Sequence, residues 1–357
     1  SDTQGVRTQI CYFSTTVKPT LNLKDTTFKS NTFTKNGRMK VLITGATGLV
    51  GSKIIQLCHD QKIAVNYLTT SKKKIIDKGF LKGFYWNPPT YELDTACFDG
   101  VTAIINLAGA SVSRRWTSSY KNEILSSRIE SLKTLYLALE KIDHSKITSF
   151  VSASAIGIYP NSLTAYHTEE ESAVDDSFLG EVVKAWEREV DLFQSFNFKV
   201  AIVRTGLVLS RKGGALPEME KPITRYVGTV FGSGEQWQSW IHIEDIGQIF
   251  MFVIKQELWG VYNAVAPNPV TNNRLVKEIA EVLKKPLILP KVPEFMMKLL
   301  LGEMAYLLFC SQRVCSRKIE EEGFHFNFQN ISSALHQLYS KDGRGQRENS
   351  TFKEKFI

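Results

Sequence analysis

Residues 39–209 alternate between two patterns of hydrophobic and polar positions. Short segments rich in aliphatic residues are typical of strands buried in a parallel sheet, and they fall at residues 41–43, 64–68, 103–107, 147–152 and 200–204. Between them, apolar residues recur at three- and four-residue spacing, which predicts helices over residues 52–59, 118–141 and 178–193. This alternation predicts an α/β fold with a right-handed, doubly wound parallel sheet.

The pattern changes after residue 212. Residues 213–245 are rich in glycine and aromatic residues, and they lead into a predicted helix at 246–255, a strand at 260–265 and a helix at 271–283. Residues 292–338 are predicted to be mainly helical, whereas the glycine, proline and aromatic residues of 79–100 predict a loop. We therefore expect a sheet domain over residues 39–212 and a smaller, mainly helical region over residues 213–340, with strands that return to the sheet.

Three glycines follow the first predicted strand: Gly45, Gly48 and Gly51. The first would allow a tight turn, the second would let a pyrophosphate approach the backbone, and the third would let the next helix pack closely on the sheet. A pyrophosphate would then lie at the positive end of that helix. The pattern predicts dinucleotide binding, and the alternative is an ordinary turn from strand to helix.

The end of the second predicted strand bears on the choice of cofactor. NAD enzymes place an acidic residue there to bind the ribose 2′-hydroxyl, whereas NADP enzymes accommodate the 2′-phosphate with other groups, often basic ones. This sequence has Thr69 and Thr70, then three lysines at 72–74, and no carboxylate before Asp77. These residues favour NADP over NAD, and the alternative is a solvated basic loop.

Several short segments make the chain resemble the epimerase family of atypical short-chain dehydrogenases/reductases, which carries a C-terminal extension. The segments are Thr44–Gly51, Asn106–Gly109, Arg114–Trp116, Ser127–Arg128, Gly213–Pro217, Ser239–His242, Ala264–Pro269, Leu301–Met304 and Gln312–Val314. The resemblance implies a Rossmann fold that binds NADP(H), with a substrate region built from residues 213–240 and the extension. The cofactor residues that it implies are Gly45, Ala46, Thr47, Gly48, Leu49, Val50, Gly51, Thr69, Thr70, Leu107, Ala108, Glu123, Arg128, Val208 and Ser239. For Arg128, an ion pair with Glu123 is the alternative.

Active members of the broader superfamily use a Ser, a Tyr and, four residues after the Tyr, a Lys to move the proton at the substrate carbonyl. Ser154, at the end of the fourth predicted strand, suits the first role, although a hydroxyl there can also cap local backbone. The positions expected for the Tyr and Lys are Leu179 and Val183, and neither side chain transfers a proton. Tyr159 is the nearest phenol in the sequence, and it either replaces the missing acid or packs under the turn at Pro160.

Two further groups of residues suggest chemistry. Arg114, Arg115 and Trp116 combine guanidinium groups with an indole, which suits an anionic or sugar substrate. His242, three residues before Asp245, resembles an oriented base, but a histidine at a sheet edge more often bonds the backbone.

Composition and charge argue against a nucleic-acid-binding, a disulfide-rich or metal-binding, and a membrane-spanning protein. Of the net charge of +8, residues 1–38 carry +4 (six basic and two acidic) and residues 341–357 carry +2 (five and three), so the body is nearly balanced. A nucleic-acid interface is therefore not expected. The five cysteines are too irregular in spacing for a disulfide framework or a metal site, so free thiols are expected. No apolar run reaches the roughly 18 residues of a membrane-spanning helix.

Two functions remain. The first is an NADP-dependent oxidoreductase or epimerase that acts on a small, unidentified substrate, and the second is an NADP(H)-binding regulatory or interaction protein with little or no turnover. Residues 1–38 and 341–357 lack apolar periodicity, and we expect both tails to be disordered. The first tail is rich in hydroxyl and basic residues, as organellar transit peptides are, so a mitochondrial or other organellar location competes with a cytoplasmic one.

Overall fold

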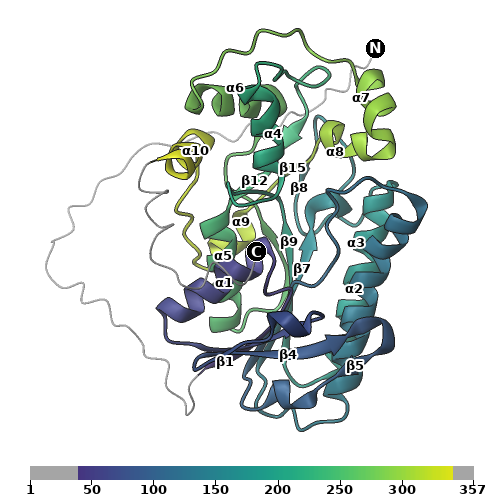
Figure 1. The fold of residues 1–357 in the computed structure, drawn as a ribbon, viewed down its shortest axis with the longest axis vertical. Helices are drawn as coiled ribbons and strands as arrows, with labels where there is room; N and C mark the ends of the chain where they lie inside the picture. Colours follow the sequence, from purple (N-terminus) through teal and green to yellow (C-terminus); the bar gives the residue numbers. More distant parts are fainter. Residues whose placement is uncertain (1–38, 341–357) are drawn as a thin grey trace, which may run out of the picture. The chain divides into compact units, whose positions relative to one another are not determined.

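The computed structural model describes residues 39–340, which are built around one twisted sheet (Figure 1). Its strands are β1 (Lys40–Thr44), β2 (Ala64–Thr69), β3 (Asp77–Lys78), β4 (Leu81–Asn87), β5 (Glu92–Leu93), β6 (Ala103–Asn106), β7 (Ser149–Ala155), β9 (Lys199–Thr205) and β13 (Gly260–Ala264). The order is β13-β9-β7-β6-β1-β2-β4-β3, and β5 pairs with β4. All pairs are parallel except those that β3 and β5 make with β4. The predicted doubly wound Rossmann sheet is confirmed, and β13 returns to it from beyond residue 212.

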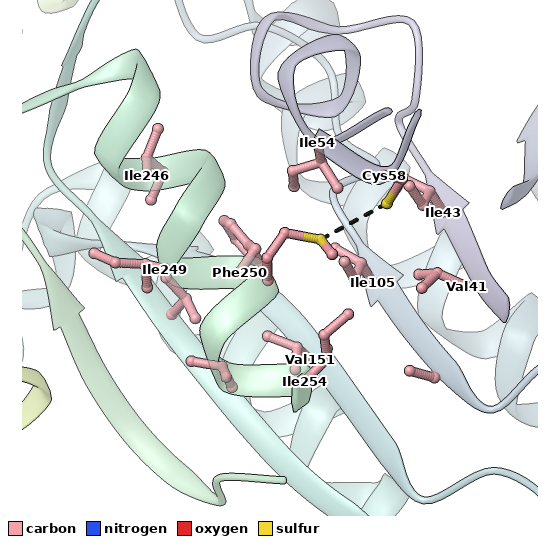
Figure 2. Packing of buried hydrophobic residues seen from close by; sticks show 14 of the residues in the cluster. Val41, Ile43, Ile54, Cys58, Ile105, Val151, Ile246, Ile249, Phe250 and Ile254 are labelled. Atoms are coloured by element: carbon pink, nitrogen blue, oxygen red, sulfur yellow. Dashed lines mark hydrogen bonds between the residues drawn. The ribbon is translucent and has the colours of Figure 1, made fainter. Parts of the chain in front are cut away.

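Helices cover both faces of the sheet because each carries one apolar stripe. On one face lie α1 (Leu49–Asp60) and α5 (Ile243–Lys255), and on the other lie α2 (Ser118–Leu139) and α3 (Phe178–Asp191) (Figure 1). Figure 2 shows Ile246, Ile249 and Phe250 of α5 facing Ile54 of α1 and the aliphatic side chains of the central strands. In the same core, the Cys58 thiol points at the sulfur of Met251, 3.7 Å away.

A second layer of elements forms the C-terminal region. Helices α4 (Ala215–Thr224), α6 (Asn272–Val282) and α10 (Ile331–Tyr339) pack around their own core, which includes Leu216, Leu275 and Leu335. Two strand pairs attach this region to the body: β10 (Leu207–Leu209) with β12 (Trp240–His242), and β8 (Tyr166–His167) with β15 (Arg313–Val314). Within the region, β11 (Trp237–Gln238) pairs with β14 (Val270–Thr271).

The extension after residue 290 runs through α7 (Glu294–Leu301), α8 (Tyr306–Phe309) and α9 (Arg317–Glu321) before α10. It is fastened to the body by the buried carboxylate of Asp245, which accepts hydrogen bonds from both nitrogens of Asn327 and from the amide of Phe328 at 2.9–3.0 Å. The Gln312 side chain donates to the carbonyl oxygen of Tyr159 at 2.6 Å. The extension is therefore part of the fold rather than an appendage.

Most predicted elements are confirmed to within a few residues, but strand β4, helix α4 and several short strands were missed. Strand β4 lies in the stretch predicted to be a loop, and its Leu81, Phe84 and Trp86 are buried beside β2. Helix α4 was not predicted, and it contains Pro222 near its end. Short 3₁₀ helices lie at Lys72–Lys74, Pro88–Thr90, Thr95–Phe98, Ile156–Ile158, Leu192–Ser195 and Gly302–Ala305. The predictions for residues 1–38 and 341–357 lie outside the described residues.

Candidate cofactor and substrate site

The turn from β1 to α1 requires glycine at two of its three glycine positions. Gly45 has φ +65°, and a Cβ atom there would lie 2.6 Å from the carbonyl oxygen of Leu107. A Cβ on Gly51 would lie 2.4 Å from the carbonyl oxygen of Gly45, so this glycine lets the helix pack against the turn. These two predicted roles are confirmed. Gly48 differs, because its φ is −77° and its added Cβ would meet only the Gly45 oxygen, at 3.2 Å.

The first turn of α1 leaves its amides without a side-chain cap. Gly48 is the N-cap residue and carries no side chain, and no acidic residue lies in the first turn. Ala46, Thr47, Leu49 and Val50 complete this turn, with Ala46 buried and the other three partly exposed. The uncapped amides and the helix dipole give this end a positive potential that suits an anion.

A hydrogen-bonded chain holds the end of β6 beside this turn. The Thr44 hydroxyl donates to Asn106 Oδ1 at 2.7 Å and accepts from the amides of Leu107 and Ala108 at 3.0 and 3.1 Å. Asn106 Nδ2 in turn donates to Ser152 Oγ at 3.0 Å, in the middle of β7. The structure thus brings Leu107 and Ala108 next to Gly45, as a shared cofactor edge requires.

The end of β2 presents hydroxyls and amines along the same edge. Thr69 is the last residue of β2, and its hydroxyl accepts from the amide of Ser71 at 3.2 Å, while Thr70 is exposed. Lys72 lies over the ring of Tyr85, 4.9 Å from its centre. After β2, the next carboxylate along the chain is that of Asp77. It belongs to β3, where Asp77 pairs in register with Lys82.

Arg128 on α2 is a partly buried cation for which residues 39–340 supply no carboxylate. Its Nη1 donates to the carbonyl oxygens of Ile124 (2.7 Å) and Ala110 (3.2 Å), its Nε has no partner among the described residues, and its guanidinium lies 4.8 Å from the ring centre of Trp186. Burial lowers the pKa of Arg128 to about 10. The alternative ion pair with Glu123 is not formed, since Glu123 is exposed on the helix surface.

The guanidinium of Arg128 lies directly under the loop that follows β6. A Cβ on Gly109 would come within 3.0 Å of the Arg128 Cζ, so glycine at this position allows the contact. The amide of Ala110 is held by the hydroxyl of Ser127 at 2.9 Å. Arg128 therefore contacts Gly109 and Ala110, the two residues that follow the Leu107–Ala108 segment beside the glycine turn.

Neither predicted catalytic hydroxyl is free to reach a substrate. Ser154 is buried and donates to Glu187 Oε1 at 2.6 Å. Tyr159 has no exposed surface, and its hydroxyl donates to Asn263 Oδ1 at 2.6 Å and accepts from Arg204 Nη1 at 3.0 Å. Burial raises the pKa of Tyr159 to about 12. The catalytic interpretation of Ser154 and Tyr159 is corrected on this ground: both hydroxyls are consumed by core hydrogen bonds.

The centre of that network is the pair formed by Arg204 and Glu187. The guanidinium of Arg204 holds both carboxylate oxygens, through Nε at 2.8 Å and Nη2 at 2.7 Å. Burial lowers the pKa of Arg204, but the hydrogen bonds and charge of Glu187 outweigh it and leave the pKa raised. Because Ser154, Arg204 and Asn263 are register neighbours on β7, β9 and β13, one polar layer links three strands to α3. The sequence signals that were missed are the glutamate on the apolar face of a helix and the arginine inside a strand.

The positions of the missing Tyr and Lys face the loop that follows β7. A Cβ on Gly157 would lie 3.7 Å from Leu179 Cβ and 4.0 Å from Val183 Cγ2. At the place where the superfamily presents a phenol and an amine, this chain therefore presents two aliphatic side chains.

Two other cofactor residues implied by the resemblance come from the chain beyond residue 206. Ser239 is buried, donates to the carbonyl oxygen of Gln312 at 2.8 Å and accepts from the amide of Val314 at 3.0 Å. Both hydrogen bonds of this hydroxyl are therefore made to the backbone of the extension. Val208 is partly buried in β10, where it pairs in register with Ile241.

The predicted substrate residues lie in the loop between β6 and α2. Arg114 and Arg115 are exposed, and Trp116 is partly buried with its Nε1 donating to the carbonyl oxygen of Val112 at 2.9 Å. The ring of Trp116 meets the edge of Phe178, the first residue of α3, at 5.3 Å between centres. The start of α2 also reaches the extension, because Lys121 forms an ion pair with Glu303 at 2.5 Å.

His242 caps a helix rather than serving as a base. Its Nδ1 accepts from the amide of Glu244 at 3.1 Å, and its Nε2 lies 3.0 Å from Gln337 Oε1, which fixes Nε2 as the protonated nitrogen. Burial lowers the pKa of His242 to about 4. The expected backbone bond of this histidine is confirmed.

Residues 39–340 show no feature of a metal centre or a membrane span. These residues contain no group of three or more His, Cys, Asp or Glu side chains that could hold a metal ion. Over the same range, every helix is too short or too polar to cross a bilayer. Cys58, Cys97, Cys310 and Cys315 are free thiols, as predicted for those four.

Comparison with known proteins decides the family. Residues 41–264 match the NAD dependent epimerase/dehydratase family, and residues 292–338 match a domain of unknown function, DUF1731. The chain belongs to the epimerase/dehydratase family. The first match spans the strands of the main sheet from β1 to β13, and the second spans the extension fastened by Asp245. The resemblance to atypical short-chain dehydrogenases/reductases is thereby confirmed.

Two relatives of this epimerase-family chain are covered over almost their whole length. An epimerase family protein of Staphylococcus aureus is 35% identical over 306 residues, which are 84% of this chain and 99% of the relative. The crystal structure of human epimerase family protein SDR39U1 with NADPH aligns with TM-score 0.73 and 26% identity, over 84% of this chain and 99% of that one. A nucleoside-diphosphate sugar epimerase of Corynebacterium glutamicum aligns with TM-score 0.67 and 28% identity, over 87% of this chain and 61% of that one. The staphylococcal relatives lend no support to an organellar address.

Proposed function

We propose that the protein binds NADP(H) at the carboxyl edge of its sheet and acts as an oxidoreductase or epimerase of the atypical short-chain type on a small substrate. The observation that carries the proposal is the partly buried guanidinium of Arg128, whose buried Nε has no partner and which has no carboxylate among residues 39–340. An uncompensated buried cation is costly, and an anionic ligand removes that cost. The human relative solved with NADPH supports the same ligand class.

The residues of the edge fit a dinucleotide. The amides of Gly48 to Gly51 would take the pyrophosphate, since Gly48 leaves the approach to the helix N-terminus open. The Leu107–Ala108 backbone, fixed by Thr44, would border the cofactor on the β6 side. When bound, the nicotinamide supplies or accepts a hydride.

The end of β2 supports NADP over NAD. Thr69, Thr70 and the lysines at 72–74 offer hydroxyl and ammonium groups, whereas a carboxylate there would repel a 2′-phosphate. NADPH is therefore expected to bind more tightly than NADH. Because Thr70 is exposed, Thr70→Asp introduces a carboxylate at this edge without disturbing the core.

A second candidate function is NADP(H) binding without turnover. The observation that favours it is the commitment of both candidate proton groups, Ser154 and Tyr159, to the buried network around Glu187. Leu179 and Val183 add no titratable group beside them. Under the first candidate, the proton comes from the substrate or from water rather than from a phenol.

Calorimetric titration with NADPH and NADH tests cofactor binding and preference. We expect tighter binding of NADPH in the natural chain, a smaller preference in Thr70→Asp, and no change in Thr168→Asp, an exposed threonine on the distant β8 loop. A preference of the natural chain for NADH would refute the assignment. Nicotinamide absorbance during a screen of carbonyl compounds and nucleotide sugars then separates the two candidates. Turnover of any of them supports the enzyme, and tight NADPH binding with none supports the second candidate.

A further inference from the structure

Helix α7 is an apolar helix that the rest of the described chain does not cover. None of its eight residues is buried, and Phe295, Leu299 and Leu300 expose 71%, 87% and 66% of their surface. Figure 1 shows α7 at the upper right end of the molecule, beside α8. An exposed cluster of large apolar side chains at one end of a molecule marks an interaction surface.

The exposed surface continues along the segment that leads into α7. Ile288 and Leu289 are exposed there, and the segment runs beside residues 226–232: Lys285 Nζ donates to the Tyr226 hydroxyl at 2.7 Å, and the amide of Val292 donates to the carbonyl of Val230 at 3.1 Å. We name this surface the apical surface. Its apolar members are Tyr226, Val227, Ile288, Leu289, Phe295, Met296, Leu299 and Leu300.

The charges that interleave with the apical surface are cationic. Residues 284–301 contain four lysines and one acidic residue, Glu294, which gives a net charge of 4 − 1 = +3. Glu294 is neutralised by Lys298 at 2.9 Å. Of the other lysines, Lys284 is exposed, while Lys285 and Lys291 bond neutral oxygens.

We propose that the apical surface docks onto an anionic lipid membrane. Segments that bind in the plane of a membrane combine exposed apolar side chains with lysines and few acids, because the apolar groups enter the headgroup region while the ammonium groups meet anionic lipids. A second copy of the chain fits less well, since a two-fold interface would place +3 against +3. Cores of protein–protein interfaces are also depleted of lysine.

Vesicle flotation of the full chain tests the proposal, with vesicles of phosphatidylcholine alone and vesicles that also contain phosphatidylglycerol. We expect binding only to the anionic vesicles. The variant Leu299→Ser/Leu300→Ser should partition at least about tenfold more weakly, because two exposed leucines no longer enter the membrane. Lys284→Gln should weaken binding about fivefold through the loss of one charge.

Two control variants carry matched changes outside the apical surface. Trp259→Ser removes an apolar side chain that is 68% exposed at the start of β13, and Lys62→Gln removes an exposed lysine that, like Lys284, has positive φ. Neither should alter binding. Because residues 1–38 are themselves basic, the supporting result is the loss in the apical variants, not the attraction of the full chain.

Three results would overturn the proposal. These are an absence of binding to anionic vesicles, equal binding by the apical variants and the natural chain, and a dimer in sedimentation that Leu299→Ser/Leu300→Ser converts to a monomer. The last result would assign the surface to a second copy. Since α7 buries no side chain, the melting temperature of the double variant should equal that of the natural chain. If it does not, Lys284→Gln alone decides the test.

Discussion

Replacing Arg128 by Met separates the cofactor role of this residue from a structural one. Methionine keeps the unbranched stem that packs on Trp186 but removes the guanidinium and its hydrogen bonds to Ala110 and Ile124. If the guanidinium binds an anionic group of the cofactor, its removal should stabilise the apo protein against unfolding and lower its affinity for NADPH. If it merely braces the loop after β6, its removal should destabilise the protein and leave binding intact.

The magnitudes follow from the burial of the charge. Burial shifts the pKa of Arg128 from 12.5 to about 10, and at 1.36 kcal/mol for each unit the charged form costs the fold about 3 kcal/mol. Because a base with a lowered pKa is charged in both states at neutral pH, this cost is fully present there and disappears only as pH rises through 10 toward 12.5. Two hydrogen bonds of about 1 kcal/mol each oppose it, so Arg128→Met should stabilise the apo protein by about 1 kcal/mol.

Loss of a charge-assisted bond to an anion weakens binding by about 1.5–3 kcal/mol, which is about 10- to 150-fold in affinity for NADPH. Urea unfolding of the apo protein measures the first quantity and calorimetry measures the second. Arg188→Met is the matched control, since Arg188 is exposed on α3, and it should change neither by much. A less stable apo variant with unchanged NADPH affinity would refute the reasoning.

Three other substitutions test single contacts. Gly48→Val should abolish most of the NADPH-induced rise in melting temperature while the apo value stays nearly constant, because an added side chain points into the cofactor approach. Retention of the full rise would place the pyrophosphate elsewhere. Tyr159→Phe should cost about 1–3 kcal/mol of stability, because the polar atoms of Arg204 and Asn263 lose a buried partner, and should leave NADPH affinity unchanged. Lost turnover at unchanged stability would restore its catalytic role. His242→Asn should flatten the acid side of the stability curve. Histidine 242 is held neutral with a pKa of about 4 against 6.5, so the natural chain should lose about 3 kcal/mol more than the variant as pH falls from neutral to about 4, measured by urea unfolding.

The order of strands and helices was predictable because the sheet is buried on both faces. Strands such as β1 and β6 then consist of continuous aliphatic runs, and these stand out from helical spacing. Strand β4 was not predicted because it lies near the sheet edge. There Lys82 is exposed, and Lys82 and Gly83 interrupt the sequence of apolar residues. A Cβ on Gly83 would lie 2.5 Å from the Tyr67 ring, so that glycine belongs to the packing of the strand and was misread as a loop signal.

The glycine turn between β1 and α1 was predictable from local sequence, whereas the environment of Tyr159 was not. The roles of Gly45 and Gly51 depend on backbone conformation within a few residues, and such roles are visible in the spacing. The environment of Tyr159 depends on Arg204 and Asn263, which lie 45 and 104 residues away in the chain. A local sequence pattern cannot predict that β7, β9 and β13 bring Ser154, Arg204 and Asn263 side by side in register.

The polar layer around Glu187 also constrains how this chain could carry out chemistry. Releasing Ser154 for catalysis would require the Glu187 carboxylate to lose that hydrogen bond, although the carboxylate is held in place by two nitrogens of Arg204. Removing one member of such a buried pair typically costs about 3–5 kcal/mol, because the other charge is left without a partner. Supplying a phenol and an amine through Leu179→Tyr and Val183→Lys would therefore not by itself rebuild the usual triad, since the serine would still point at Glu187. Under the proposed function, the proton for a reaction at this edge would come from the substrate or from water, because Leu179 and Val183 supply none.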